Sequence, residues 1–281
     1  MNTAIDPITS AYVRDVIARV KANTTGALVT NLFLTDSEIE SVAAQGGLAV
    51  TQQTRAALFF LQDGPVRRVY FAASSPEELG EALRSVPGDG RMLCDVIGGE
   101  DTVVRYSGPL EQAGFKWKRR YLRMSRFPAN NNARPLGDRV DYDEVETAVD
   151  SDAPLILAEL RSEFDPETDH LPSLERIRRS IAAGTVLIVR DTPLSSKPGI
   201  GVICYWDRTG KAAAISRYWV VRPYLRRTSA GLRAWVRFLH DTADCRRVQL
   251  WVREENTNAI TIYKFYGFEF DAAVDDIFVR G

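Results

Sequence analysis

Residues 220–235 of the chain read VVRPYLRRTSAGLRAW. Two valines end a predicted strand, a loop with three arginines follows, and the small residues Ser229, Ala230 and Gly231 open a predicted helix. The first turn of a helix leaves backbone N–H groups unpaired and carries the positive end of the helix dipole. Small residues let an anion approach these donors, and arginines add charge-assisted hydrogen bonds. The stretch therefore predicts a pyrophosphate site, with an ordinary strand–loop–helix joint as the alternative.

Basic residues are concentrated around this stretch. Residues 208–240 include eight arginines and lysines and no acidic residue, although the whole chain has a net charge of −1. Two interpretations fit this pattern, a solvated basic face and a site for an anionic ligand. Nucleic-acid binding ranks last, because no helix-turn-helix or RNA-binding signature accompanies the charges and the chain is slightly acidic.

A second informative stretch, NTNAITIYKFYGFEF, covers residues 256–270. It predicts a short helix and a strand that meet at Gly267-Phe268. Tyr263 lies in the middle of the helix, where it is either one more aromatic core residue or a group for chemistry. Asn256 precedes the helix and belongs to the residue types favoured at an N-cap.

The two halves of the chain end alike. Residues 92–126 have a strand, a polar turn, a short helix, a Gly-Phe pair and a final strand, in the same order as the end of the second half. This order predicts a duplicated fold, with Leu110 in the place of Tyr263. The Asn- and Pro-rich residues 127–138 are typical of a linker. We predict domains at 1–130 and 140–281, joined by a linker at 131–139.

Hydrophobic periodicity predicts the order helix, helix, three strands, helix, strand, helix, strand in the second half. The first half has a similar order, and its best-defined helix begins at Pro76 behind the N-cap candidate Ser75. Glu77 and Glu78 stand at the start of that helix. Their charges would repel a pyrophosphate, so the first half is predicted to be a degenerate copy.

Composition places the chain among globular proteins, with 45% hydrophobic and 26% charged residues in a length of 281. No apolar run is long enough to span a membrane, and the N-terminal stretch does not resemble a signal peptide. The three cysteines are widely spaced and only two histidines are present, which argues against a disulfide framework or a zinc site. We expect a cytoplasmic protein with no metal and no membrane partner.

Residues 221–231 resemble the acetyl-CoA-binding motif of the GNAT N-acyltransferase superfamily, a strand ending in V-x-P followed by R/Q-x-x-G-x-G/A. Arg226 falls on the Arg/Gln position, Gly231 on the last glycine, and the small Ser229 on the first glycine. Residues 256–268 are similar to the superfamily pattern N-x-x-A-x-x-x-Y-x-x-x-G-F, with Tyr263 on the tyrosine. The resemblance covers the second half and is fainter in the first.

The resemblance implies an α/β (α+β) protein of two tandem GNAT-like domains, each a mixed, mostly antiparallel twisted sheet flanked by helices. It implies that the second domain moves an acetyl group from acetyl-CoA, as co-substrate, to a primary amine on a small molecule. The residues implied for donor binding are Trp219, Val220, Val221, Arg226, Arg227, Thr228, Ser229, Ala230, Gly231 and Asn256. Asn256 would either contact the pantetheine arm or cap its own helix.

Tyr263 is the candidate general acid, because a phenol with a pKa of about 10 can protonate a departing thiolate whose parent pKa is about 8.5. No general base is assigned. Glu254 and Glu255 follow a predicted strand, Asp207 is placed in a hairpin turn, and neither His170 nor His240 has a role. The acceptor pocket could use aromatic residues that would otherwise be core, namely Tyr205, Trp206, Tyr218, Trp219 and Tyr224.

An alternative to the enzyme is a non-catalytic acyl-CoA-binding or regulatory protein with the same fold. The absence of an obvious base favours it, and the register of Tyr263 opposes it. A homodimer is left open by the sequence.

Overall fold

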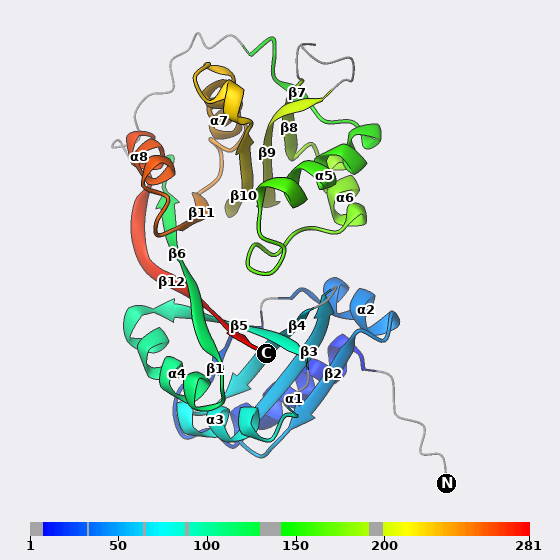
Figure 1. Ribbon diagram of the computed structural model, residues 1–281, viewed down its shortest axis with the longest axis vertical. Coiled ribbons are helices and arrows are strands. Elements are labelled where there is room, and N and C mark those ends of the chain that lie inside the picture. Colours follow the sequence, from blue (N-terminus) through cyan, green and yellow to red (C-terminus); the bar gives the residue numbers. More distant parts are fainter. Residues whose placement is uncertain (1–7, 33, 64–65, 88–89, 130–141, 191–198) are drawn as a thin grey trace. The chain divides into compact units, whose positions relative to one another are not determined.

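The computed structural model describes residues 8–32, 34–63, 66–87, 90–129, 142–190 and 199–281. The chain divides into two compact units (Figure 1). Unit 1 comprises residues 1–121 and 272–281, and unit 2 comprises residues 122–271. These units differ from the domains predicted at 1–130 and 140–281, because the last ten residues belong to unit 1. The predicted linker, 131–139, lies outside the described residues.

Unit 1 is built on a sheet with the strand order β2-β3-β4-β5-β12, to which β1 adds by pairing with β4. All of its pairs are antiparallel except β4 with β5. The elements are α1 (Ser10–Ala22), β1 (Val29–Thr30), α2 (Asp36–Ala44), β2 (Leu48–Gln52), β3 (Ala56–Asp63), β4 (Val66–Ala73), α3 (Pro76–Arg84), β5 (Arg91–Gly99), α4 (Glu100–Gln112) and β6 (Lys116–Arg126). The predicted N-cap is confirmed, since Ser75 accepts a hydrogen bond from the Glu78 backbone at 3.3 Å.

Unit 2 has the strand order β6-β11-β10-β9-β8-β7, with β10 and β11 parallel and the β8–β9 and β9–β10 pairs antiparallel. The elements are β7 (Glu146–Thr147), α5 (Ala153–Glu163), α6 (Leu174–Ala182), β8 (Val186–Arg190), β9 (Ile200–Thr209), β10 (Ala213–Val221), α7 (Ala230–Asp241), β11 (Arg247–Arg253), α8 (Thr257–Phe265) and β12 (Glu269–Arg280). Both the predicted element order and the predicted mixed, mostly antiparallel sheets flanked by helices are confirmed.

Helices cover both faces of the unit 2 sheet (Figure 1). One core lies between the sheet and α7 and α8, around Trp235 and Phe268. The other lies between the sheet and α5 and α6, around Ile156 and Ile177. Leu232 is 41% exposed, because it lies on the outer side of α7 while the apolar stripe runs through Trp235.

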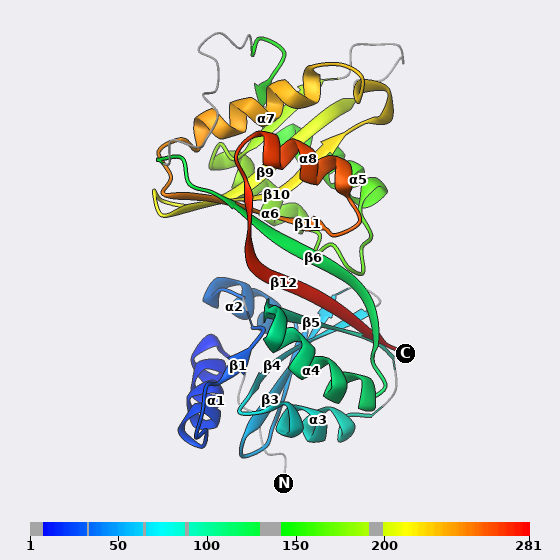
Figure 2. The same cartoon turned by 90° about the vertical axis from the view of Figure 1, so that its left-hand side faces the viewer.

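The two long strands β6 and β12 are each shared between the units (Figure 2). β6 begins in unit 1, and Leu122–Arg126 belong to unit 2, where β6 neighbours β11. β12 begins in unit 2, and Ala273–Arg280 pair with Met92–Gly99 of β5 in unit 1. Each unit is therefore completed by a strand that the other half of the sequence supplies.

A buried acidic pair in unit 1 makes a pH-dependent contribution to stability. Asp275 on β12 lies opposite Ile97, and Asp95 on β5 lies opposite Ile277, so the two buried carboxyl groups are diagonal neighbours. Burial, and then the charges of Asp95 and Asp276, raise the pKa of Asp275 well above its ordinary value. Asp275 Oδ1 has no hydrogen-bond partner in the described part of the chain.

Replacing Asp275 by asparagine is expected to make the protein less sensitive to alkaline pH. A carboxyl whose pKa is raised by folding stabilises the fold fully below the unfolded pKa of about 4, and this stabilisation is lost as pH rises through the folded pKa. The neutral amide does not titrate, so the difference in unfolding free energy between variant and wild type should move in favour of the variant between pH 5 and pH 8. Urea unfolding at several pH values measures this. The exposed Asp101→Asn is the control, and a pH-independent difference for Asp275→Asn would contradict the expectation.

Candidate functional site

Strands β10 and β11 of unit 2 separate after a short parallel pairing. They pair only at Ala213–Ser216 with Arg247–Leu250, and a bulge in β10 follows between Ser216 and Tyr218. Beyond the bulge, β10 continues to Val221, and no described strand pairs with its β11 side there. The separation opens a gap between the two strands.

The edge of β10 that faces this gap is unpaired. Arg222 N donates to Gly201 O at 3.0 Å and therefore points toward β9. Because successive peptide groups of a strand alternate in direction, the backbone groups of Trp219 and Val221 point the other way, into the gap. Among the described residues, no strand pairs with β10 at these two positions. Val221 O accepts from Arg226 Nε at 3.2 Å, so the backbone groups of Trp219 and the N–H of Val221 are left for a ligand lying in the gap.

The start of α7 adjoins the end of this strand. Ser229 occupies the N-cap position, and its side chain makes no capping hydrogen bond. Thr228 Oγ1 accepts from Ala230 N at 3.3 Å and donates to Leu225 O at 2.8 Å. Within the described residues, the backbone N–H groups of Ser229 and Gly231 have no acceptor. The helix start thus keeps the unpaired donors that an anion site at this position would need.

Gly231 sets the distance between helix and strand. A Cβ atom at this position would lie 2.6 Å from Val221 Cγ2, which is closer than real Cβ contacts allow. Trp219 Nε1 also donates to Gly231 O at 3.2 Å. The glycine is thus required by the close packing of α7 on β10. The neighbouring Val220 points to the opposite face, into the core around α5 and α6.

The arginines of the loop are not equivalent. Arg222 forms an ion pair with the buried Glu159 of α5, so it serves the packing of the unit. Arg226 Nε donates to Val221 O at 3.2 Å, and its Nη2 lies 3.8 Å from Glu163 Oε2. Arg227 is exposed and has no partner among the described residues. Arg227 is therefore the arginine whose charge is available beside the helix start.

This pattern extends over the whole basic segment 208–240. Six of its eight cations lie against carboxylates, in the pairs Arg208–Asp244, Arg217–Asp207, Arg222–Glu159, Arg226–Glu163, Arg233–Glu144 and Arg237–Asp241. In the described chain, Lys211 and Arg227 are the two left without such a partner. The apparent excess of positive charge in the sequence is largely compensated in the fold.

Tyr263 lies on α8 with its ring in an aromatic cluster. Its ring centroid is 5.1 Å from that of Trp235, 5.9 Å from that of Trp219 and 6.0 Å from that of Phe268. The residue is 8% exposed, and burial, followed by the neighbouring Cys204, raises the pKa of its phenol above the ordinary value. The hydroxyl makes no hydrogen bond to any described residue. The ring is therefore a core group, and its protonated hydroxyl is left for another partner.

Sequence reasoning missed a second donor in this cluster. Trp235 is fully buried, with its ring centroid 4.9 Å from that of Trp219, and its Nε1 has no hydrogen-bond partner in the described residues. The helical pattern indicated only a core residue. Nothing in the sequence separates a buried indole with a partner from one without.

Asn256 caps α8. Its Oδ1 accepts from Ala259 N at 3.2 Å, as the N-cap alternative required. The capped helix carries Tyr263 two turns further on. The structure thus brings the strand edge at Trp219–Val221, the start of α7 and Tyr263 together within unit 2.

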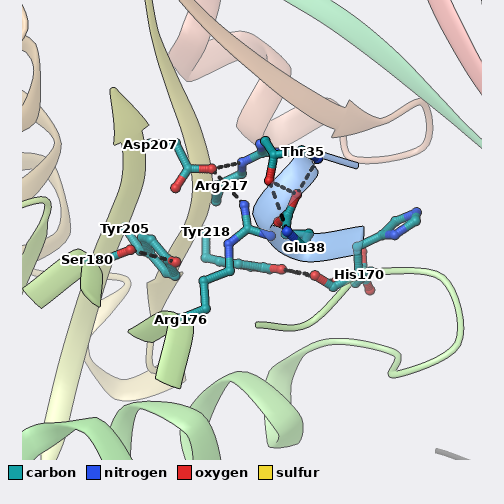
Figure 3. A network of polar contacts seen from close by, with 10 residues as sticks. Thr35, Glu38, His170, Arg176, Ser180, Tyr205, Asp207, Arg217 and Tyr218 are labelled. Carbon is teal, nitrogen blue, oxygen red and sulfur yellow. Dashed lines mark hydrogen bonds and ion pairs between the residues drawn. The ribbon is translucent and has the colours of Figure 1, made fainter. Parts of the chain in front are cut away.

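On the opposite side of the sheet, Asp207 is already engaged. Asp207 lies within β9, and not in the turn as predicted, and it accepts from Arg217 Nε at 2.6 Å and from Arg176 Nη2 at 3.0 Å (Figure 3). Two guanidinium groups therefore occupy its carboxylate. Glu254 and Glu255 lie in an exposed turn after β11.

Three of the predicted pocket aromatics are buried core residues. Tyr218 OH donates to His170 O at 2.6 Å, Ser180 Oγ donates to Tyr205 OH at 2.9 Å (Figure 3), and Trp206 packs on Phe238. Tyr224 is exposed. Among the described residues, no group of three or more His, Cys, Asp or Glu could hold a metal ion, and no helix is long and apolar enough to cross a membrane.

The fold has relatives among solved structures. A tandem GNAT protein from the clavulanic acid biosynthesis pathway matches 94% of this chain and 92% of its own, with a TM-score of 0.56 and 13% identity. The chain is a tandem GNAT-fold protein.

Two further solved structures of GNAT proteins have a similar fold. A GCN5-related N-acetyltransferase from Sphaerobacter thermophilus matches 80% of this chain and 76% of its own, with a TM-score of 0.55 and 15% identity. Another from Kribbella flavida matches 85% and 93%, with a TM-score of 0.55 and 14% identity. No protein-family model matches the sequence, and no curated protein matches it. At these identities the GNAT likeness is one of fold.

Proposed function

We propose that unit 2 is an N-acyltransferase that moves an acetyl group from acetyl-CoA to the primary amine of a small molecule in the cytoplasm. The observation that carries this proposal is the unpaired edge of β10 at Trp219–Val221. This edge adjoins the start of α7, and the ring of Trp219 lies 5.9 Å from that of Tyr263, which supports a donor arm with α7 at one end and Tyr263 at the other. The proposed acceptor is neither a nucleic acid nor a membrane component.

Donor binding is assigned to this chain's own groups as follows. The N–H groups of Ser229 and Gly231 would hold the pyrophosphate, with Arg227 adding a charged contact. The backbone of Trp219 and Val221 would hold the pantetheine arm, in the way that a strand pairs with its neighbour. Asn256 uses Oδ1 for capping, so only its amide nitrogen is left for a contact with the arm.

The chemistry follows from this placement. The neutral amine attacks the thioester carbonyl, a C–N bond forms, and the C–S bond breaks. A backbone N–H at the β10 edge stabilises negative charge on the carbonyl oxygen. Tyr263 gives its phenolic proton to the sulfur as it departs, the proton lost by the amine passes to water, and water returns a proton to the Tyr263 phenolate.

A thiol-release assay with acetyl-CoA over a panel of small amines tests the proposal. Amine-dependent release of CoA is the expected result, and calorimetry should give binding of acetyl-CoA. Failure to bind acetyl-CoA would remove the proposal altogether.

A second candidate function is a non-catalytic acyl-CoA-binding or regulatory protein. The observation that favours it is the engagement of Asp207 by two arginines, which leaves no free carboxylate on β9. Tight binding of acetyl-CoA with no amine-dependent thiol release would support this candidate over the enzyme.

Replacing Arg227 by alanine is expected to raise the Kd for acetyl-CoA about 10- to 100-fold, the equivalent of one or two charge-assisted hydrogen bonds. Lys211→Ala is the matched control, since Lys211 is also a cation without a carboxylate partner but lies in the β9–β10 turn. Calorimetry of both variants makes the comparison. Equal affinities for the two variants would place the pyrophosphate elsewhere.

A further inference from the structure

Unit 1 has the same strand separation as unit 2. Its parallel strands β4 and β5 pair only at Val66–Val69 with Arg91–Cys94, a run of four pairs at the start of the strands, as in β10 and β11. Ser74 N donates to Arg55 O at 3.0 Å, as Arg222 N donates to Gly201 O. Phe71 lies three positions before Ser74, as Trp219 lies three positions before Arg222. Phe71 of unit 1 therefore corresponds to Trp219 of unit 2. The backbone groups of both point into the gap.

In unit 1 the chain itself occupies this gap. Strand β1, in the connection from α1 to α2, pairs with β4 at Val29–Ala73 and Thr30–Ala72. Thr30 Oγ1 donates to Phe71 O at 2.7 Å, and Asn31 N donates to the same oxygen at 3.3 Å. The backbone edge that is open in unit 2 is therefore paired in unit 1.

The side chain of Asn31 completes the occupation. It is 2% exposed, accepts from Phe71 N at 2.6 Å, and donates to Val69 O at 3.2 Å and to Asp95 O at 2.6 Å. One buried amide thus joins the two diverging strands β4 and β5. Both of its polar atoms are satisfied, so it fills the gap without leaving an unpaired group.

Unit 2 lacks the corresponding contact. The described residues between α5 and α6 form no strand, and β10 pairs only with β9 and β11. This connection contacts β10 through a side chain, since Tyr218 OH donates to His170 O at 2.6 Å and to Asp169 O at 3.2 Å. The same element of the duplicated fold is thus folded into the gap in one unit and outside it in the other.

We propose that the α1–α2 connection is an internal occupant of the donor gap of unit 1, in which Thr30 and Asn31 take the hydrogen bonds that an acyl donor would make. The chain then binds one acyl donor, in unit 2. An internal segment loses no translational freedom on binding, and an external ligand would have to displace it and leave the Asn31 amide unpaired. That the excluded ligand is an acyl donor rests on the proposed function, whereas the occupation of the gap by Thr30 and Asn31 does not.

Amide hydrogen exchange resolved by NMR on the full chain tests the proposal. Without ligand, the Phe71 amide should be protected and the Trp219 amide should exchange at least about tenfold faster, because only the first has an acceptor. Adding acetyl-CoA should slow Trp219 and leave Phe71 unchanged, with one equivalent bound per chain by calorimetry. Asn31→Ala should raise Phe71 exchange about tenfold or more. Asn23→Ala should not, since Asn23 is an exposed residue bonded to Arg19 O.

The outcomes separate this proposal from the proposed function. Rapid Phe71 exchange in the unliganded wild type, or slowing of Phe71 by a second equivalent of acetyl-CoA, would overturn the internal occupant. Absence of any acetyl-CoA binding would remove the proposed function, and Phe71 protection would then still support the occupation of the gap. The wild-type measurement needs no variant, so a failure of Asn31→Ala to fold leaves the test intact.

Discussion

Replacing Tyr263 by phenylalanine is expected to lower the turnover number of acetyl transfer about 10²- to 10⁴-fold, the range for loss of a general acid. The Kd for acetyl-CoA should stay within about twofold. The ring packs among Trp219, Trp235 and Phe268 and is kept in the variant, whereas the hydroxyl bonds to no described residue. The variant thus removes the proton donor and leaves the packing in place.

Initial rates of thiol release and calorimetry with acetyl-CoA measure the two quantities separately. Tyr266→Phe is the matched control, because Tyr266 lies at the end of the same helix with its ring edge-on to Phe265. We expect the control to keep wild-type turnover. A Tyr263→Phe enzyme as fast as the control would show that the thiolate leaves without this proton.

Truncating Trp235 to alanine is expected to lower the unfolding free energy by about 3–5 kcal/mol, the range for large buried aromatic residues. The indole is fully buried, and its centroid lies 5.0 Å from that of Phe238 and 5.8 Å from that of Phe268. No neighbouring ring can collapse into the space without giving up its own contacts. Because Trp235 also supports Tyr263, the same change should slow acetyl transfer.

Urea unfolding followed by circular dichroism measures the loss. Trp117→Ala is the control, since Trp117 is 54% exposed, and it should cost less than about 1 kcal/mol. The loss of unfolding free energy for Trp235→Phe should lie between the losses for the two alanine variants, because phenylalanine keeps a ring in the cluster. A loss for Trp235→Ala as small as that of the control would mean that the cluster does not hold α7 on the sheet.

Local patterns were sufficient to predict the element order of the second half, whereas β1, α2 and β2 of the first half were not identified. Helix α3 begins with a serine cap and a proline, and α8 begins with an asparagine cap, so the start of each is encoded within a few residues. The close approach of Gly231 to Val221 is also local, since a strand end and the next helix start must meet there. These are the parts of the candidate site that the sequence could predict.

The parts that could not be predicted depend on distant partners. Asp207 was placed in a turn because Asp-Arg-Thr-Gly is typical of turns. In the structure it stays in β9 between Arg217 and Arg176, and the second of these is 31 positions away. Arg222 likewise resembles a phosphate ligand until its partner Glu159, 63 positions away, is known. Charge patterns along a chain do not reveal which charges the fold will neutralise.

The occupation of the unit 1 gap by the α1–α2 connection could not be predicted from the sequence either. The sequence around Asn31 forms a strand of only two residues, and the side chain bonds to carbonyl groups 38 and 64 positions away. The two glutamates at the start of α3 did predict a degenerate copy, but by repulsion of a ligand. The structure adds a different reason, because the place of the ligand is already taken.

The sharing of β6 and β12 has a consequence for how the protein is made. Residues 272–281 leave the ribosome only after all of unit 2 has been synthesised, yet they are the strand that pairs with β5. Until then β5 is an open edge, of the kind that invites pairing with other nascent chains. The half that is translated first is therefore finished only after the second half has been made, and its maturation waits for the synthesis of β12.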